Sequence, residues 1–236
     1  ESKYIFSYSP ERFLKLDKDI VLTSPIKGTI KRDENTKRDL KLKNQLLKSS
    51  KDLAENLMIV DVLRNDISRV CSYGSVKVNK LAELESYQNV HHLVSSITGT
   101  LSKNKDVFDL LKSTLPGGSI TGAPKVRAME IISELENNNR GVYCGVIGYM
   151  SFSGFSDFNI PIRTITINKK QAYLNSGGGI VADSVPSKEY KELLNKVSNL
   201  FPKKNKKENL SNEKIIKLWL YIIMENILMN EKFLLT

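Results

Sequence analysis

The six residues Ser24–Thr29 restrict the backbone more than any other stretch of this 236-residue chain. Pro25 fixes one backbone dihedral angle, and Gly28 removes the crowding that a Cβ atom would cause. The turn therefore holds an amine and a hydroxyl group, those of Lys27 and Thr29, within a small range of positions. A lysine amine is a nucleophile only when it is unprotonated, which burial or a neighbouring cation favours. The alternative is an ordinary surface lysine in a β-turn.

A carboxyl group is expected close to this lysine. Residues Lys3–Ser9 alternate apolar and polar side chains as a half-buried strand does, and Glu11 follows where that strand ends. Asp19–Thr23 is predicted as a second strand that leads into the turn, so Glu11 and Lys27 are expected at neighbouring strand ends of a hairpin-like pair. A carboxyl group and an amine placed together can divide acid and base work. A salt bridge at the rim of a sheet would give the same pattern.

Two predicted helices, Lys51–Val70 and Ser187–Leu200, each carry two acidic residues one turn apart near their start. Carboxylate oxygens are ligands that Mg²⁺ prefers, and two such pairs make a magnesium site more credible than one. The alternative is that the carboxylates are only solvated. The pairs are Asp52 with Glu55 and Glu189 with Glu192.

Glycine-rich segments and one arginine predict a site for a carboxylate. The loop Pro116–Lys125 places small residues before a helix that runs to about Glu136, where free N–H groups can face an anion. No Walker sequence follows, so a carboxylate fits this loop better than a nucleotide phosphate. Arg163 lies in an apolar, β-branched stretch that is predicted as a strand, where a guanidinium needs an anion. Gly177–Gly179 exposes backbone N–H donors that would complete such a site.

The other periodic segments predict a mixture of strands and helices. The expected strands are Gly74–Asn79, His92–Leu101, Tyr143–Phe152, Asp157–Asn168 and Gln171–Ser176, and the expected helices are Asp33–Ser50 and Asp106–Leu115.

Composition excludes several classes of protein. The net charge is +10, but the lysines lie at exposed-looking helix positions and do not gather with aromatic residues, so a solvated surface is favoured over a nucleic-acid site. Cys71 and Cys144, the two cysteines, lack CxxC spacing, which argues against a zinc site or disulfide framework and fits a cytoplasmic protein. No apolar run reaches the ~18 residues of a membrane span. Because Glu1 opens the chain directly before a strand, we expect a fragment that lacks an upstream part.

Six motifs, in order and between about residue 4 and residue 202, resemble those of the chorismate-utilising enzymes. The resemblance implies an α+β fold of two packed antiparallel sheets with outer helices, of which this chain holds an incomplete part. It also implies that residues 1–202 are the C-terminal part of a chorismate-binding catalytic domain. The motifs are Ser9-Pro10-Glu11-Arg12-Phe13, Pro25-Ile26-Lys27-Gly28-Thr29, Ala54–Asp66, His92-Leu93-Val94-Ser95, Gly122–Met129 and Gly177–Ser184.

Within this family, the lysine of the Pro-Ile-Lys-Gly-Thr motif resembles the branch that converts chorismate and ammonia to 4-amino-4-deoxychorismate, towards 4-aminobenzoate and folate. Anthranilate, isochorismate and salicylate synthases usually carry Ala at the position of Lys27. An amine can add at C2 of chorismate as the C4 hydroxyl leaves, and ammonia can then enter at C4 as the amine departs. Two alternatives stay open, namely anthranilate synthase component I and a truncated fragment without catalytic activity.

The resemblance implies a role for each matching residue. Lys27 resembles the covalent nucleophile, and Glu11 resembles the general acid for the departing hydroxyl. The direct Mg²⁺ ligands are Glu55 and Glu192, and the acids that hold the metal's waters are Asp52 and Glu189. The enolpyruvyl carboxylate pocket comprises Tyr143, Arg163, Gly177 and Gly179, and the contacts to the ring side are Gly28, Thr29, His92 and Ser119.

A partner subunit and a separate C-terminal segment are also expected. Neither cysteine lies in a nucleophile-elbow sequence, so the resemblance implies a separate glutamine amidotransferase subunit that supplies ammonia. Residues 203–236 begin as a charged linker and continue as an apolar stretch too short and too interrupted to span a membrane. This stretch resembles the opening of the aminodeoxychorismate lyase domain fused downstream in some bacterial synthases.

Overall fold

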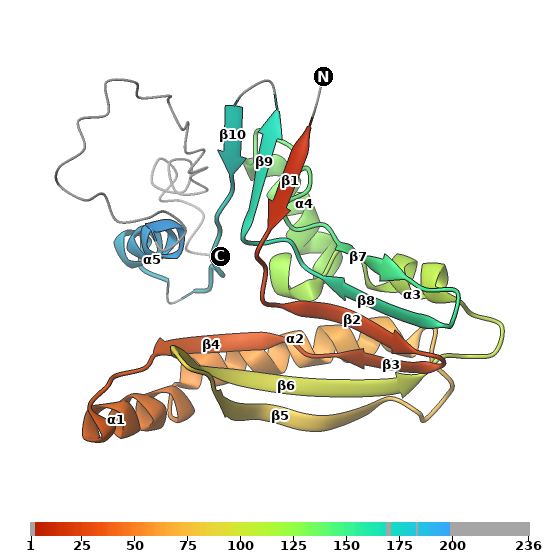
Figure 1. Ribbon diagram of the computed structural model, residues 1–236, viewed down its shortest axis with the longest axis horizontal. Coiled ribbons are helices and arrows are strands. Elements are labelled where there is room, and N and C mark those ends of the chain that lie inside the picture. Colours follow the sequence, from red (N-terminus) through yellow and green to blue (C-terminus); the bar gives the residue numbers. More distant parts are fainter. Residues whose placement is uncertain (1–2, 169–170, 183, 199–236) are drawn as a thin grey trace. The chain divides into compact units, whose positions relative to one another are not determined.

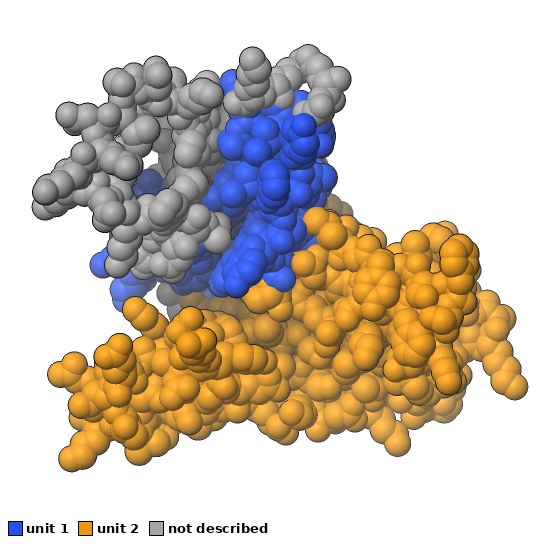
Figure 2. Space-filling view, in the orientation of Figure 1, with its two compact units in different colours: residues 1–9, 132–143, 161–236 blue, residues 10–131, 144–160 orange. Residues whose placement is uncertain are grey.

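The computed structural model describes residues 3–168, 171–182 and 184–198, so the predictions for residues 203–236 lie outside the described residues. The chain divides into two compact units (Figure 2). The smaller takes its described residues from 1–9, 132–143 and 161–236, and the larger consists of residues 10–131 and 144–160. Both units are therefore assembled from segments far apart in the sequence.

The larger unit is built on an antiparallel sheet in which β6 (Val90–Thr100) pairs with three other strands (Figure 1). Strand β5 pairs with one edge of β6, while β4 and β3 lie end to end along the other edge. Strands β2, β8 and β7 continue the sheet beyond β3. These strands are β2 (Arg12–Asp17), β3 (Ile20–Thr23), β4 (Ile26–Lys31), β5 (Lys77–Ser86), β7 (Ile147–Met150) and β8 (Phe155–Asn159).

Helix α2 (Ser50–Ser68) supplies much of the core of this unit. It begins after Ser49, whose hydroxyl accepts a hydrogen bond from the N–H of Asp52, and it contacts β4, β5 and β6. Full burial of an aliphatic side chain contributes roughly 1.5–3 kcal/mol. The buried apolar residues of α2 are Ile59, Val60, Leu63 and Ile67. The other helices of this unit are α1 (Thr36–Leu47), α3 (Val107–Thr114), the 3₁₀ turn η1 (Gly118–Ile120) and the first part of α4 (Lys125–Leu135), whose residues from 132 onward belong to the smaller unit.

A buried histidine ties α1 to the sheet. His91 Nε2 lies 3.0 Å from Asp39 Oδ1, and His91 Nδ1 lies 2.8 Å from Ser86 Oγ. Arg32 Nη2 donates to Asp39 Oδ2 at 3.0 Å, and hydrogen bonding by this guanidinium is the main reason that the pKa of Asp39 lies below its ordinary value. Asp39 therefore links α1 to the end of β4, through Arg32, and to the start of β6, through His91. The candidate site lies on these same two strands.

The smaller unit contains a three-stranded antiparallel sheet in the order β1-β9-β10. Its strands are β1 (Tyr4–Ser7), β9 (Thr164–Asn168) and β10 (Gln171–Leu174), followed along the chain by α5 (Pro186–Ser198). All four side chains of β1 are exposed, although three of them are Tyr4, Ile5 and Phe6. The α+β class and the two antiparallel sheets are thus confirmed. Within the described residues, none of the helices is both long and apolar enough to cross a membrane.

The expected hairpin between the first two strands is wrong. Strand β1 pairs with β9, whereas β3 pairs with β2 (Arg12–Asp17), a strand that the sequence analysis did not predict. Glu11 therefore lies between β1 and β2, directly before β2 begins. The turn of the β2–β3 hairpin contains Lys18, whose φ of 57° is a left-handed conformation. The sequence analysis did not predict this turn because its residues are charged and include no glycine or proline.

Three expected strands also have different limits. The segment Asp157–Asn168 is two strands, β8 and β9, which belong to different sheets. Pro161 lies between them, and a proline cannot donate a hydrogen bond to a sheet. Only Ile147–Met150 of Tyr143–Phe152 is a strand, and the strand expected at Gly74–Asn79 begins at Lys77 and runs to Ser86.

Candidate active site

The larger unit brings together Glu11, Lys27 and Ser119, three of the predicted site residues. The Ser119 side chain hydrogen-bonds to the Glu11 carboxyl group, and the charge of Lys27 lies close enough to act on it. Glu11 is only 9 % exposed, and Lys27 is half-buried in β4. Burial raises the pKa of Glu11, while the hydrogen bond from Ser119 and the charge of Lys27 oppose that rise with smaller effects. Glu11 therefore keeps its proton at a higher pH than an exposed glutamate does.

The turn expected to hold Lys27 and Thr29 is instead part of strand β4, whose register against β6 shifts between Ile26 and Thr29. Gly28 lies at this irregularity and lets β4 approach α2 closely. Its φ is +82°, and a Cβ atom there would lie 3.0 Å from Cβ of Asp52. Thr29 follows on β4 and is paired with His92 on β6, with 2.8 Å between Thr29 Oγ1 and His92 Nδ1. The expected ring-side residues Gly28, Thr29 and His92 thus lie next to one another on β4 and β6, with Gly28 against Asp52.

The metal-binding acids predicted in this unit lie near the start of α2. Asp52 is in its first turn, and Glu55 follows one turn later. The Glu55 side chain is 15 % exposed, and its Oε1 lies 3.9 Å from Lys51 Nζ. Both carboxylates are partly shielded from water, which suits a cation ligand better than a fully solvated acid.

The smaller unit contains the predicted carboxylate pocket and the second acidic pair. Gly177 lies against Tyr143, because a Cβ atom on Gly177 would meet the Tyr143 hydroxyl at 2.6 Å. Glu189 is buried and accepts a hydrogen bond of 2.7 Å from Ser184 Oγ. Glu189 Oε2 would lie 3.5 Å from a Cβ atom on Gly178. The glycine run therefore lies close to both Tyr143 and Glu189, and Gly179 continues it towards α5.

Arg163 does not lie where the sequence analysis placed it. It is exposed and directly precedes β9, rather than being buried inside a strand. Its backbone N–H donates to Ser9 Oγ at 3.1 Å, and its carbonyl accepts from the N–H of Tyr8 at 2.9 Å. The β-branched residues around it suggested burial, but the chain bends there from one sheet to the other. Its exposed position therefore avoids the cost of burying a guanidinium without an anion.

The sequence analysis missed Lys196. Its Nζ lies 2.7 Å from Glu192 Oε1 and donates to the carbonyl of Gly177 at 3.1 Å. The signal was present, because Lys196 follows Glu192 by one helical turn on α5. The ammonium group adds a positive charge next to the glycine run.

The predicted metal acids form two pairs, one in each unit. Carboxylate oxygens suit a hard cation such as Mg²⁺, so the chemistry of the donors fits the expected ion. Over residues 3–168, 171–182 and 184–198, no three His, Cys, Asp or Glu residues lie close enough together to hold a metal ion. Magnesium binding therefore stays a prediction.

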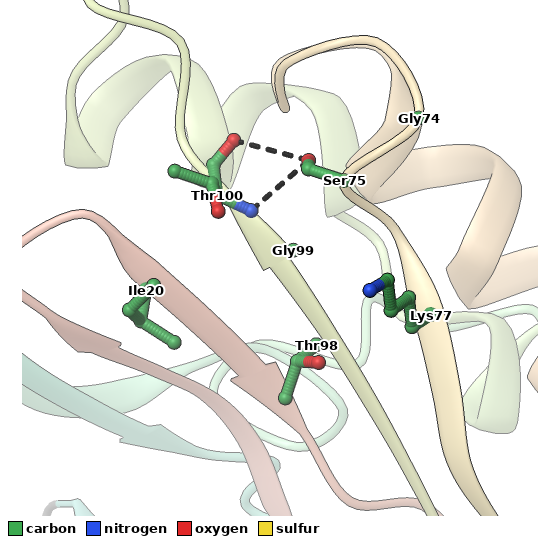
Figure 3. Close-up of a pocket in the computed structure, with 7 residues that line it drawn as sticks. All are labelled: Ile20, Gly74, Ser75, Lys77, Thr98, Gly99 and Thr100. Atoms are coloured by element: carbon green, nitrogen blue, oxygen red, sulfur yellow. Dashed lines mark hydrogen bonds between the residues drawn. The ribbon is translucent and has the colours of Figure 1, made fainter.

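A surface hollow of about 340 Å³ lies elsewhere in the larger unit (Figure 3). It is formed at the end of β6 opposite to His92, and Figure 3 shows the Ser75 hydroxyl hydrogen-bonded to both backbone groups of Thr100. None of the predicted site residues lines it, so we do not assign it to the active site. Its lining residues are Ile20, Gly74, Ser75, Lys77, Thr98, Gly99 and Thr100.

Solved structures with a similar fold define the class of protein. Anthranilate synthase component I from Streptococcus pneumoniae aligns with a TM-score of 0.73 and 39 % identity, over 84 % of this chain and 43 % of that one. A putative 2,3-dihydroxybenzoate-specific isochorismate synthase from Bacillus anthracis aligns with a TM-score of 0.72 over 84 % of this chain and 53 % of that one, and at 23 % identity it shows the fold alone. The fold is therefore that of enzymes that use chorismate.

The family of chorismate binding enzymes matches residues 1–202, and this chain belongs to that family. Aminodeoxychorismate synthase component 1 from Salmonella typhimurium is 53 % identical over 83 % of this chain and 43 % of its own length. Anthranilate synthase component 1 from Aquifex aeolicus is 46 % identical over 83 % of this chain and 40 % of its own length. The chain thus spans less than half the length of these relatives.

Proposed function

We propose that this chain is part of an aminodeoxychorismate synthase component I, which converts chorismate and ammonia to 4-amino-4-deoxychorismate. The observation that carries the proposal is the placement of an amine, Lys27, beside a buried acid, Glu11. Three relatives that are 50–53 % identical bear the name aminodeoxychorismate synthase component 1, which supports this choice. The product would lead towards 4-aminobenzoate and folate.

The proposed reaction has two balanced steps. In the first, Lys27 Nζ forms a bond to C2 of chorismate while the C4–O bond breaks, and Glu11 gives its proton to the hydroxyl, which leaves as water. In the second, ammonia forms a bond to C4 while the bond between C2 and Lys27 breaks. The Glu11 carboxylate then takes the proton from the new ammonium group. The sum is chorismate plus ammonia to aminodeoxychorismate plus water, with both side chains restored.

The environment of Glu11 supports its role as an acid. A general acid must hold a proton at the pH of the reaction, and burial of Glu11 favours the protonated form. Ser119 keeps the carboxyl group oriented through its hydrogen bond.

The remaining predicted residues would bind the substrate and the metal. Mg²⁺ would be held by Glu55 and Glu192, with Asp52 and Glu189 binding its waters, and would offset the charge of the ring carboxylate. The residues proposed for the enolpyruvyl carboxylate are Tyr143, Arg163, Gly177 and Gly179, and those for the ring side are Gly28, Thr29, His92 and Ser119.

Ammonia would come from a partner. The words "component 1" in the relatives' names imply at least one further component. We propose a glutamine amidotransferase subunit for this partner, because the chemistry consumes ammonia. A cytoplasmic location is part of the same proposal, because Cys71 and Cys144 are not joined in a disulfide.

Replacement of Lys27 by alanine tests the proposal. Lys27→Ala is expected to lower the rate of aminodeoxychorismate formation by roughly 10²-fold or more, because the covalent step is lost, while chorismate affinity survives. Any residual product should shift towards the 2-amino isomer, since ammonia can then reach C2. Lys31→Ala, which removes an exposed lysine from the same strand, is the matched control. Mass spectrometry of quenched parent protein should find a chorismate-derived adduct on the Lys27 peptide, and unchanged turnover without an adduct would reject the role.

Anthranilate synthase component I is the second candidate. Relatives with this name are 44–48 % identical to the chain, which is close to the values for the first candidate. That reaction adds ammonia at C2 and has no use for an amine that competes there. Products of the reaction with chorismate, ammonia and Mg²⁺ distinguish the two, because anthranilate and pyruvate would replace aminodeoxychorismate.

A further inference from the structure

Lys125 and Asp66 form a largely buried ion pair that the proposed chemistry does not use. Lys125 Nζ lies 2.5 Å from Asp66 Oδ2, and the two side chains are 16 % and 5 % exposed. Burial raises the pKa of Asp66, and the hydrogen bond and charge of Lys125 oppose that rise. Such pairs are costly to desolvate, and apolar replacements are often equally stable. Stability is therefore a weak explanation for the presence of this pair.

The position of Lys125 suggests another explanation. Thr114 ends α3 and Lys125 begins α4, so these two residues flank the loop of residues 115–124. Lys125 Nζ also donates to the carbonyl of Thr114 at 3.0 Å. One ammonium group therefore joins both ends of the loop, and Asp66 anchors that junction to α2.

The loop is also held at its centre. A Cβ atom on Gly118 would lie 2.7 Å from Cγ1 of Val62 on α2, so the loop backbone rests directly on the helix. Inside the loop, Thr121 Oγ1 donates to the carbonyl of Gly117 at 2.9 Å. The next residue after Gly118 is Ser119, whose side chain meets the Glu11 carboxyl group. Movement of either loop end would change where that hydroxyl lies.

We propose that the Lys125–Asp66 pair is a positioning device, which closes the loop on α2 so that the Ser119 hydroxyl meets Glu11. Lys125 and Asp66 contact neither the substrate nor the reacting atoms in this scheme. The inference rests on the proposed function only for what Glu11 does, because the placement of Ser119 can be measured without turnover.

The first test removes both charges at once. Lys125→Met/Asp66→Leu keeps the side-chain volume, and its unfolding midpoint is expected at or above that of the parent. Amide hydrogen exchange of residues 117–121 is expected to become about tenfold faster, the change that loss of one hydrogen bond to a charged group produces. The amides of Ile120 and Thr121 report on the loop, since both donate to loop carbonyls at 3.3 Å. Unchanged exchange in a folded variant would overturn the proposal.

Two controls sharpen this comparison. Arg127→Met/Glu130→Leu removes an exposed ion pair from the same helix and should leave exchange of the loop unchanged. Lys125→Arg keeps the positive charge and several N–H donors, so amide exchange of the loop in this variant should stay close to that of the parent. If the Leu-containing variant does not fold, Lys125→Met/Asp66→Asn takes its place with the same two outcomes.

The second test asks whether Lys125 acts through Ser119. Lys125→Met/Asp66→Leu and Ser119→Ala are each expected to lower kcat/KM about tenfold, and the combined variant should lose no more than either alone. Losses that multiply would show that the pair acts by another route and would overturn the proposal. A parent protein that makes no aminodeoxychorismate would reject the proposed function, and the exchange experiment would then decide the inference by itself.

Discussion

At the scale of single residues, the proposed chemistry depends on a carboxyl group that stays protonated. Glu11 is buried, and its two polar neighbours, Ser119 and Lys27, weaken the effect of burial without cancelling it. A native pKa above the ordinary value means that the folded protein binds this proton more tightly than the unfolded chain does. Stability from this group is therefore complete below the ordinary pKa of about 4.5 and is lost as the pH rises through the native value.

Glu11→Gln separates this stability effect from catalysis. Glutamine stays neutral at every pH, so the variant is expected to be at least as stable as the parent near pH 8 and no more stable near pH 4. Turnover should fall by about 10²–10⁴-fold because the proton donor is lost. Urea unfolding at both pH values, with Glu83→Gln on the exposed part of β5 as control, provides the measurement. A variant that is less stable than the parent only at pH 8 would mean that the ionised carboxylate is the favoured form.

At the scale of secondary-structure elements, the site depends on how closely β4 approaches the helices. Gly28 has a positive φ and lies against Asp52 of α2 and Leu46 of α1. Gly74 also has a positive φ, but a Cβ atom there would meet nothing within 4 Å. The two glycines therefore share the backbone requirement, and only Gly28 has the packing requirement as well.

Comparison of Gly28→Ala with Gly74→Ala isolates the packing contribution. Each alanine is expected to lower the free energy of unfolding by about 1–2 kcal/mol because its backbone is left-handed. Gly28→Ala should lower it by about 1–3 kcal/mol more, because its Cβ atom would lie 3.0 Å from Cβ of Asp52. The free energy of unfolding in urea measures the difference. Equal losses at the two positions would show that α2 can move away from β4 at no cost.

At the scale of the whole molecule, the predicted ligand residues occur in both compact units. Glu11, Lys27 and His92 belong to the larger unit, and Arg163 and Gly177 belong to the smaller one. The relatives named above are more than twice as long as the part of them that this chain matches. Whether the chain by itself binds chorismate is thus a separate question from what the whole enzyme does.

Thermal unfolding with chorismate and Mg²⁺ answers that question. A ligand at about 100 times its dissociation constant stabilises the folded state by about 2.7 kcal/mol, which should raise the unfolding midpoint by about 5 °C or more. His92→Ala in the larger unit and Arg163→Ala in the smaller unit should each reduce the shift if both units take part. No shift of the parent protein at saturating ligand would instead favour a fragment without catalytic activity.

Much of this protein was determined by the sequence itself. The spacing of apolar residues predicted α2 and α5, Asp106 was correctly expected at the start of α3, and six motifs identified the family that the comparison confirmed. Helical periodicity and capping involve residues three or four positions apart, so a short stretch of chain contains the necessary information.

Only the tertiary structure decided how distant segments meet. It placed β2 between β3 and β8, divided Asp157–Asn168 between two sheets, and exposed Arg163. It also buried Glu11 near Ser119 and brought Lys125 and Asp66 together as an ion pair. Strand partners and burial depend on contacts between residues far apart along the chain, and local periodicity carries no information about which of those contacts form.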